Sequence, residues 1–241
     1  MEITNPTPTP TEFFRSYAFR ICVYAGFTLV LFEMVYAAVK THGAEVVAAE
    51  NGPIEMSQMV LAIVGALTLF LAAKLTPAGR TGLILCGCVV AYAAAREGDQ
   101  LFEEYLFDDA YKWLVGLPMV VLGATFVVID RKRLVGDVMW LMKHPVATLF
   151  AIAGIYLCFV CQIYDRPEMW GGMDAINEAG ESQLAVTKAL IEEYAELFAY
   201  LLLAISGVEA AFLAYGRRVE AMKAQDDADS SKPESPIRLA A

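Results

Sequence analysis

Several acidic residues and one arginine lie at the ends of apolar segments of this 241-residue chain. The stretch Arg96-Glu97-Gly98-Asp99 follows an apolar run, residues 81–95, that is shorter than the roughly 20 residues a membrane-spanning helix needs. If this run spans a bilayer, its helix continues into the charged stretch. Charged groups near that depth are costly unless they are paired or line a wet cavity, so they indicate a functional site.

The predicted site gathers the acids at one end of the spans, with one arginine as counter-ion. Its members are Glu33, Glu55, Arg96, Glu97, Asp99, Glu193 and Glu196. On a helix, Glu193 and Glu196 share a face because they are three residues apart, and so do Arg96 and Asp99. Neighbouring carboxylates repel unless they share a proton, bind a cation or face a guanidinium. Each arrangement would have functional consequences.

Several of these acids also have simpler interpretations. Glu55 follows Pro53 in the first turn of a helix, where an acid is favoured by the helix dipole, and Glu192 and Glu193 can cap the last span in the same way. Glu33 and Glu196 interrupt apolar runs, which favours a polar network that either functions or fixes helix packing. The acids around residues 103–109 are typical of a solvated face, and Glu209 can pair structurally with an arginine near residue 217.

Metal chemistry is limited by the two histidines, His42 and His144, which form no H-x-x-x-H or E-x-x-H motif. An intramembrane zinc hydrolase is therefore disfavoured. A divalent cation held by oxygen ligands, such as Ca²⁺, Mg²⁺ or Mn²⁺, stays open as a cofactor. A serine hydrolase is weakly supported because the chain has no G-x-S-x-G motif.

All five cysteines lie within apolar runs. Cys158 and Cys161 form a C-x-x-C pair near the end of a span, a pattern that also occurs in membrane thiol oxidoreductases. Those enzymes use a second cysteine pair in a loop, and no loop here carries one. We therefore favour buried small residues over redox chemistry.

The composition predicts a membrane protein. Aliphatic, aromatic and Cys residues make up 58% of the chain and charged residues 19%, which is too apolar for a soluble domain of this size. Nucleic acid is excluded as a partner because the pI is about 4.7 and there is no basic stripe. We expect the lipid bilayer as the main partner, a lipid or small cation as ligand, and leave a homo-oligomer open.

The elements that position the site form an all-α membrane bundle. We predict six spans at residues 21–39, 56–73, 81–95 with its extension, 113–129, 145–163 and 194–215, and an interfacial segment at 134–144. Residues 1–12 form a flexible lead, 13–218 the membrane domain and 219–241 a disordered tail. No secretory signal peptide is evident, so the first span is expected to act as the signal anchor.

The charges alternate between the connecting segments. Of the 18 basic residues, 13 fall on one side: Arg15, Arg20, Lys74, Arg80, Arg131, Lys132, Arg133, Lys143, Arg217, Arg218, Lys223, Lys232 and Arg238. The positive-inside rule assigns that side, and both termini, to the cytoplasm. Most acids then face outward, which accounts for much of the net charge of −10.

Three stretches resemble segments of polytopic bacterial inner-membrane proteins that have no assigned activity. They are Glu50-Asn-Gly-Pro-Ile-Glu-Met-Ser-Gln58, Arg96-Glu-Gly-Asp99 and Glu192-Glu-Tyr-Ala-Glu-Leu-Phe-Ala-Tyr200. The resemblance implies a multi-pass protein of the bacterial inner membrane whose outer-face acids belong together. It implies no particular chemistry.

The first functional hypothesis is a cation or proton site in the outer leaflet, used in transport or sensing. The second is a membrane enzyme acting on a lipid or lipid-linked substrate at the periplasmic face, with a carboxylate as general base and Arg96 on a phosphate. The third is a structural or assembly subunit of a membrane complex. Six spans are few for a secondary transporter, and no pair of Gly/Pro-broken helices is present.

Overall fold

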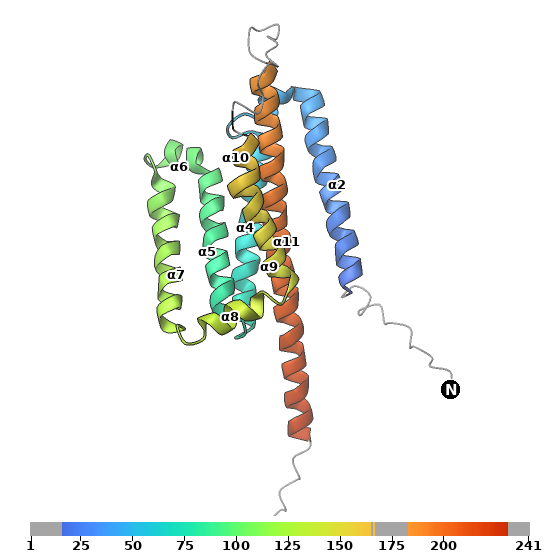
Figure 1. Ribbon diagram of the computed structural model, residues 1–241, viewed down its shortest axis with the longest axis vertical. Coiled ribbons are helices and arrows are strands. Elements are labelled where there is room, and N and C mark those ends of the chain that lie inside the picture. The colour runs from blue at the N-terminus through green and yellow to red at the C-terminus, as the bar shows by residue number, and fades with distance from the viewer. Residues whose placement is uncertain (1–15, 165, 167–182, 231–241) are drawn as a thin grey trace, which may run out of the picture. The chain divides into compact units, whose positions relative to one another are not determined.

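The computed structural model describes residues 16–164, 166 and 183–230, and every element in these ranges is helical, which confirms the all-α prediction (Figure 1). In chain order the elements are α2 (Tyr17–His42), α3 (Ala44–Val47), α4 (Pro53–Leu75), α5 (Arg80–Glu97), α6 (Asp99–Tyr105), η1 (Lys112–Gly116), α7 (Leu117–Ile129), α8 (Leu134–Leu141), α9 (Pro145–Ile155), η2 (Tyr156–Val160), α10 (Cys161–Tyr164) and α11 (Gln183–Ser230). Here η1 and η2 are π-helical turns that continue directly into α7 and α10.

Five segments of the described chain are long and apolar enough to cross a membrane: Tyr17–His42, Pro53–Leu75, Lys112–Ile129, Pro145–Tyr164 and Gln183–Asp227. They contain five of the six predicted spans and are compatible with a multi-pass membrane protein. Helix α5 is not among them. It has 18 residues, of which Arg80, Arg96 and Glu97 are charged. The sixth span therefore stays a prediction.

Helix α11 is much longer than the predicted span of residues 194–215. It begins at Gln183 and continues to Ser230. We expect residues 219–241 to be disordered because they are polar, yet the first part of this tail is rich in Ala, Glu, Lys and Met, which favour helix. Residues 231–241 and the lead at 1–12 lie outside the described residues.

The chain forms two compact units. Unit 1 comprises residues 1–58 and 154–201, and unit 2 comprises residues 59–153 and 202–241. The boundaries fall inside α4, near the end of α9 and inside α11, so each of these helices contributes residues to both units.

In unit 1, aromatic side chains pack α2 against α11. The ring of Phe32 stacks on Tyr194 with a centroid separation of 5.5 Å, and it also contacts Phe198. Tyr156 of η2 meets Phe198 edge-on at 5.3 Å. Of the 26 residues of α2, only Val35 is buried. The apolar remainder of α2 is exposed, as expected of a helix that is long and apolar enough to cross a membrane.

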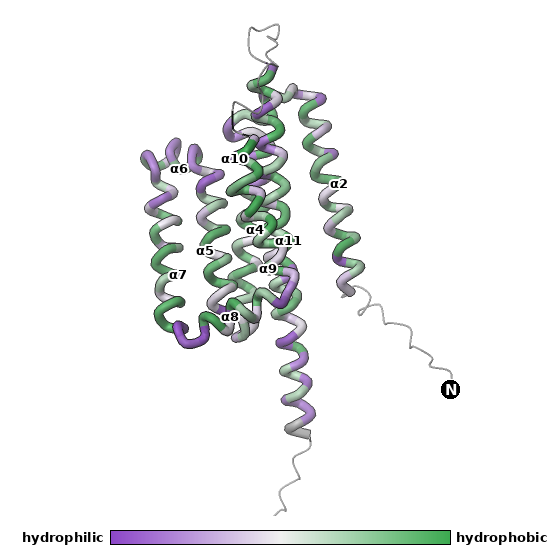
Figure 2. Tube along the Cα trace, in the orientation of Figure 1, coloured by the Kyte–Doolittle hydropathy of each residue, from purple (hydrophilic) through white to green (hydrophobic). Residues whose placement is uncertain are grey.

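In unit 2, α5 runs beside α7, and α8 lies across one end of α5 (Figure 1). The two ends carry opposite charges. The Thr81 hydroxyl donates to the Asp130 carboxylate at 3.2 Å, which places the start of α5 beside the basic 130–133 turn. The opposite end holds the acids of α6 and the loop after it. Figure 2 shows hydrophilic residues at both ends of α7 and apolar residues between. This arrangement is the charge segregation that the sequence predicts for this part of the chain.

Candidate functional site

Four of the predicted site residues belong to unit 1. Glu33 lies on α2 and is exposed, while Glu55 lies in the first turn of α4 and is half-buried. Glu193 and Glu196 lie on α11 and are half-buried. The ring of Phe32 stacks on Tyr194, so these turns of α2 and α11 are neighbours. Glu33 follows Phe32 on α2, and Glu193 precedes Tyr194 on α11.

The Glu55 carboxylate accepts a hydrogen bond from the backbone N–H of Asn51, just before α4. Asn51 itself has a positive φ of 57°, which asparagine tolerates better than most residues. This contact closes the turn that starts the helix, much as the glutamate of a capping box does. Glu55 therefore stabilises the turn that precedes α4, and its favourable place in the helix dipole stays a prediction.

The best-defined polar pair of unit 1 joins Gln58 of α4 to Glu193 of α11. The Gln58 side chain is fully buried. Its amide nitrogen donates to the Glu193 carboxylate at 2.8 Å and to the Glu193 backbone carbonyl at 3.1 Å. Because the backbone carbonyl can only accept, the amide must present its nitrogen to it.

This orientation leaves the amide oxygen of Gln58 buried and without a hydrogen-bond donor among the described residues. A buried acceptor without a donor costs roughly 1–3 kcal/mol. A proton donor or a cation beside this oxygen would remove that cost. Unit 1 therefore contains a buried carbonyl oxygen with unused acceptor capacity next to a carboxylate.

Cys161 of unit 1 is fully buried. Cys158, the other member of the C-x-x-C pair, is exposed, and both are free thiols. Redox chemistry at this pair stays a prediction.

The other three predicted residues belong to unit 2. Arg96 and Glu97 end α5, with Arg96 exposed and Glu97 buried, and half-buried Asp99 begins α6. Arg96 ends α5 and Asp99 begins α6, with Gly98 between the two helices. The expected pairing of Arg96 with Asp99 stays a prediction.

Among residues 16–164, 166 and 183–230, no three His, Cys, Asp or Glu side chains are grouped so that they could hold a metal ion. The pairing of Glu193 with Glu196 on one helix holds, because α11 is continuous there. Whether the seven predicted residues form one site stays a prediction, since they are divided between the two units.

Several buried polar residues of the structure are absent from the predicted site, and two of them make hydrogen bonds between distant segments. Gln58 is one, although a glutamine in the second turn of an apolar helix is itself a signal. Asp137 of α8 is the other: its carboxylate accepts from the backbone N–H groups of Gly79 at 3.2 Å and Thr81 at 3.0 Å. The sequence signal for Asp137 is indirect. Helix α5 begins after Gly79, which has no side chain to cap it, so the first N–H groups of α5 need an acceptor from elsewhere in the chain.

The chain matches no protein-family model, and neither a curated protein nor a solved structure is significantly similar to it. The resemblance of its three acidic stretches to bacterial inner-membrane proteins therefore stays a prediction.

Proposed function

We propose that this protein is a multi-pass membrane protein that binds a proton or a small cation at the buried polar pair of Gln58 and Glu193, for transport or sensing. Five apolar segments support the membrane assignment. We include in this proposal the six spans predicted from the apolar runs, the inner membrane implied by the resemblance, and the cytoplasmic termini favoured by the charge distribution.

The observation that carries the proposal is the unused acceptor capacity of the buried Gln58 amide oxygen beside the Glu193 carboxylate. A proton on the Glu193 carboxylate would supply the missing hydrogen-bond donor. A cation between the carboxylate and the Gln58 amide oxygen would instead coordinate both oxygens. Ionisable groups are rare within spans and typically mark proton or ion pathways. A proton is the simplest ligand, because one carboxylate and one amide suffice to hold it.

The same pair also supports the structural alternative. The hydrogen bonds from Gln58 to Glu193 join α4 to α11 within unit 1, and buried polar contacts of this kind stabilise helix packing in membranes by roughly 0.5–2 kcal/mol. A purely structural pair would stabilise the fold, and its stability would not respond to protons or cations. The two functions therefore predict different behaviour when pH and cation concentration are varied.

The test is the Glu193→Gln variant of the full chain in detergent. The new amide oxygen can still accept from Gln58, so the helix contact is retained while proton binding at the carboxylate is lost. We expect the melting temperature of the native protein to depend on pH or on added Na⁺, K⁺ or Ca²⁺. This dependence should disappear in the variant.

Glu192→Gln is the matched control, because it removes the same charge from the adjacent position of α11 and should retain the response. The Gln58→Leu variant removes one of the two oxygens of the site and should weaken the cation response, while the Glu193 carboxylate can still bind a proton. An identical pH and cation response in the native protein and in Glu193→Gln contradicts the proposal. A lowered melting temperature with an unchanged response assigns the pair to packing alone.

A further inference from the structure

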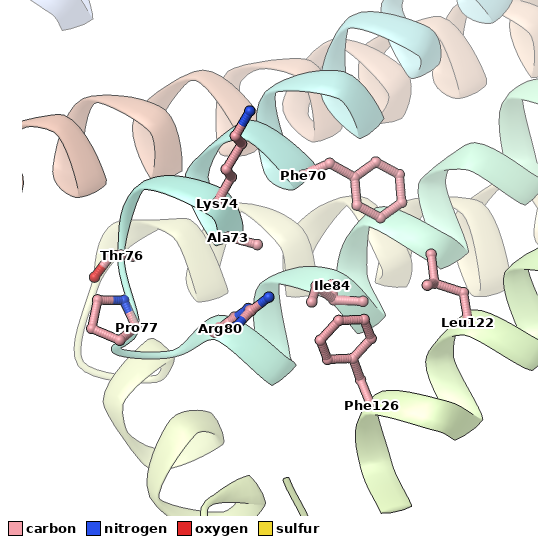
Figure 3. Close-up of a pocket in the computed structure, with 9 residues that line it drawn as sticks. All are labelled: Phe70, Ala73, Lys74, Thr76, Pro77, Arg80, Ile84, Leu122 and Phe126. Carbon is pink, nitrogen blue, oxygen red and sulfur yellow. The ribbon is translucent and has the colours of Figure 1, made fainter. Parts of the chain in front are cut away.

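A cavity of about 400 Å³ opens in unit 2 between α4, α5 and α7. Figure 3 shows two cationic side chains in its lining, Lys74 from the last turn of α4 and Arg80 from the start of α5. The rest of the lining is mostly apolar and includes Phe70, Ile84, Leu122 and Phe126. None of the described residues that line the cavity is acidic.

The positive charges of Lys74 and Arg80 are not neutralised by an ion pair with a described acidic residue. The guanidinium of Arg80 lies over the Phe126 ring, 5.3 Å from its centroid, which holds the side chain against the cavity wall. Two acids at this end of unit 2, Asp130 and Asp137, accept hydrogen bonds from Thr81.

The lining has a cationic part and an apolar part. The cations come from the helix ends at the basic end of unit 2, whereas Leu122 and Phe126 lie on α7, inside a segment apolar enough to span a membrane. A ligand that satisfies both parts carries a negative charge at the membrane interface and an apolar chain below it. A small soluble anion would use only the cationic part.

We propose that this cavity binds an anionic phospholipid, with Arg80 at its phosphate, Lys74 adding positive charge at the rim of the cavity, and the apolar side chains against its acyl chains. Basic residues near a membrane surface attract anionic lipids by about 1 kcal/mol each. The basic 130–133 turn lies beside the same helix start and adds to the local positive potential. The proposal uses residues of unit 2 alone and does not depend on the Gln58 and Glu193 pair.

Native mass spectrometry of the full chain, titrated with phosphatidylglycerol in detergent, tests the proposal. The double variant Lys74→Gln/Arg80→Gln should weaken phosphatidylglycerol binding by about tenfold or more. The control Lys132→Gln/Arg133→Gln removes the same charge from the adjacent turn, outside the cavity lining, and should change binding much less. Equal losses in both double variants would indicate general charge attraction and overturn the proposal.

The apolar part of the site has its own test. Leu122→Trp fills the cavity without changing any charge and should also reduce phosphatidylglycerol binding, while the melting temperature reports whether the variant folds. Inorganic phosphate at millimolar concentration should not displace the lipid. Displacement by phosphate, or a Leu122→Trp variant that folds and binds as the native protein does, would identify a soluble-anion site and overturn the lipid assignment.

Discussion

The buried side chain of Asp137 caps the start of α5. Its carboxylate accepts from two N–H groups at the start of α5, which has no side-chain cap of its own. Gly79 there has a φ of +72°, a conformation that glycine adopts readily, and any side chain at that position would overlap the Trp140 ring. Asp137 therefore sets where α5 begins and how it meets α8.

Replacing Asp137 with alanine should lower the free energy of unfolding by about 1–3 kcal/mol, because two buried N–H groups lose their acceptor. Asp137→Asn retains one amide oxygen and should lose less. Chemical denaturation in mixed micelles measures both changes. Asp108→Ala, at an exposed position, is the control and should stay within about 0.5 kcal/mol. A loss at Asp137 no larger than at Asp108 would contradict this role.

At the scale of elements, α4 and α11 approach closely in unit 2 because both carry glycine at the contact. A Cβ atom at Gly207 would lie 2.5 Å from the backbone carbonyl oxygen of Gly65. Contacts between small residues are a main source of helix association in membranes, where lipid is as apolar as the side chains. The closeness of this pair of helices therefore depends on the missing side chain.

Gly207→Ala should destabilise the protein by about 1–3 kcal/mol, since the added methyl group meets backbone that cannot move cheaply. Gly216→Ala is the matched control on the same helix. Nothing lies within 4 Å of a Cβ there, so this change should be neutral or stabilising by up to about 1 kcal/mol through helix propensity. Thermal melting in detergent compares the two. Equal effects would show that the close approach carries no energetic weight.

At the scale of the whole molecule, the segregation of charge predicts its orientation in the membrane. Within unit 2 the basic turn at residues 130–133 lies at the start of α5, and the acids of α6 follow its end. A fluorescent-protein fusion at the C-terminus should therefore fluoresce in bacterial cells. Alkaline phosphatase inserted at residue 107 should be active, because that enzyme works only outside the cytoplasm. The reverse pattern would overturn the proposed topology.

The sequence alone was sufficient for the features that depend on local composition. Hydropathy located five apolar spans, Asn51-Gly-Pro53 marked the start of α4, and the charged residues after Ile129 marked the end of α7. Each of these signals lies within a few residues of the feature it predicts. Polarity alone does not reveal that the helix continues to Ser230, because polar residues such as Glu220 and Lys223 also favour helix.

Only the tertiary structure could decide the contacts between distant positions. Gln58 and Glu193 are 135 residues apart, and Asp137 is 56 residues from Thr81. Nothing in the local sequence of either partner specifies the other, because helix packing, and not helix formation, brings them within hydrogen-bond distance. The lipid cavity arises in the same way, since Lys74, Arg80 and Phe126 come from three helices that pack together. Composition determined which segments are helical and apolar, and packing determined which polar groups meet.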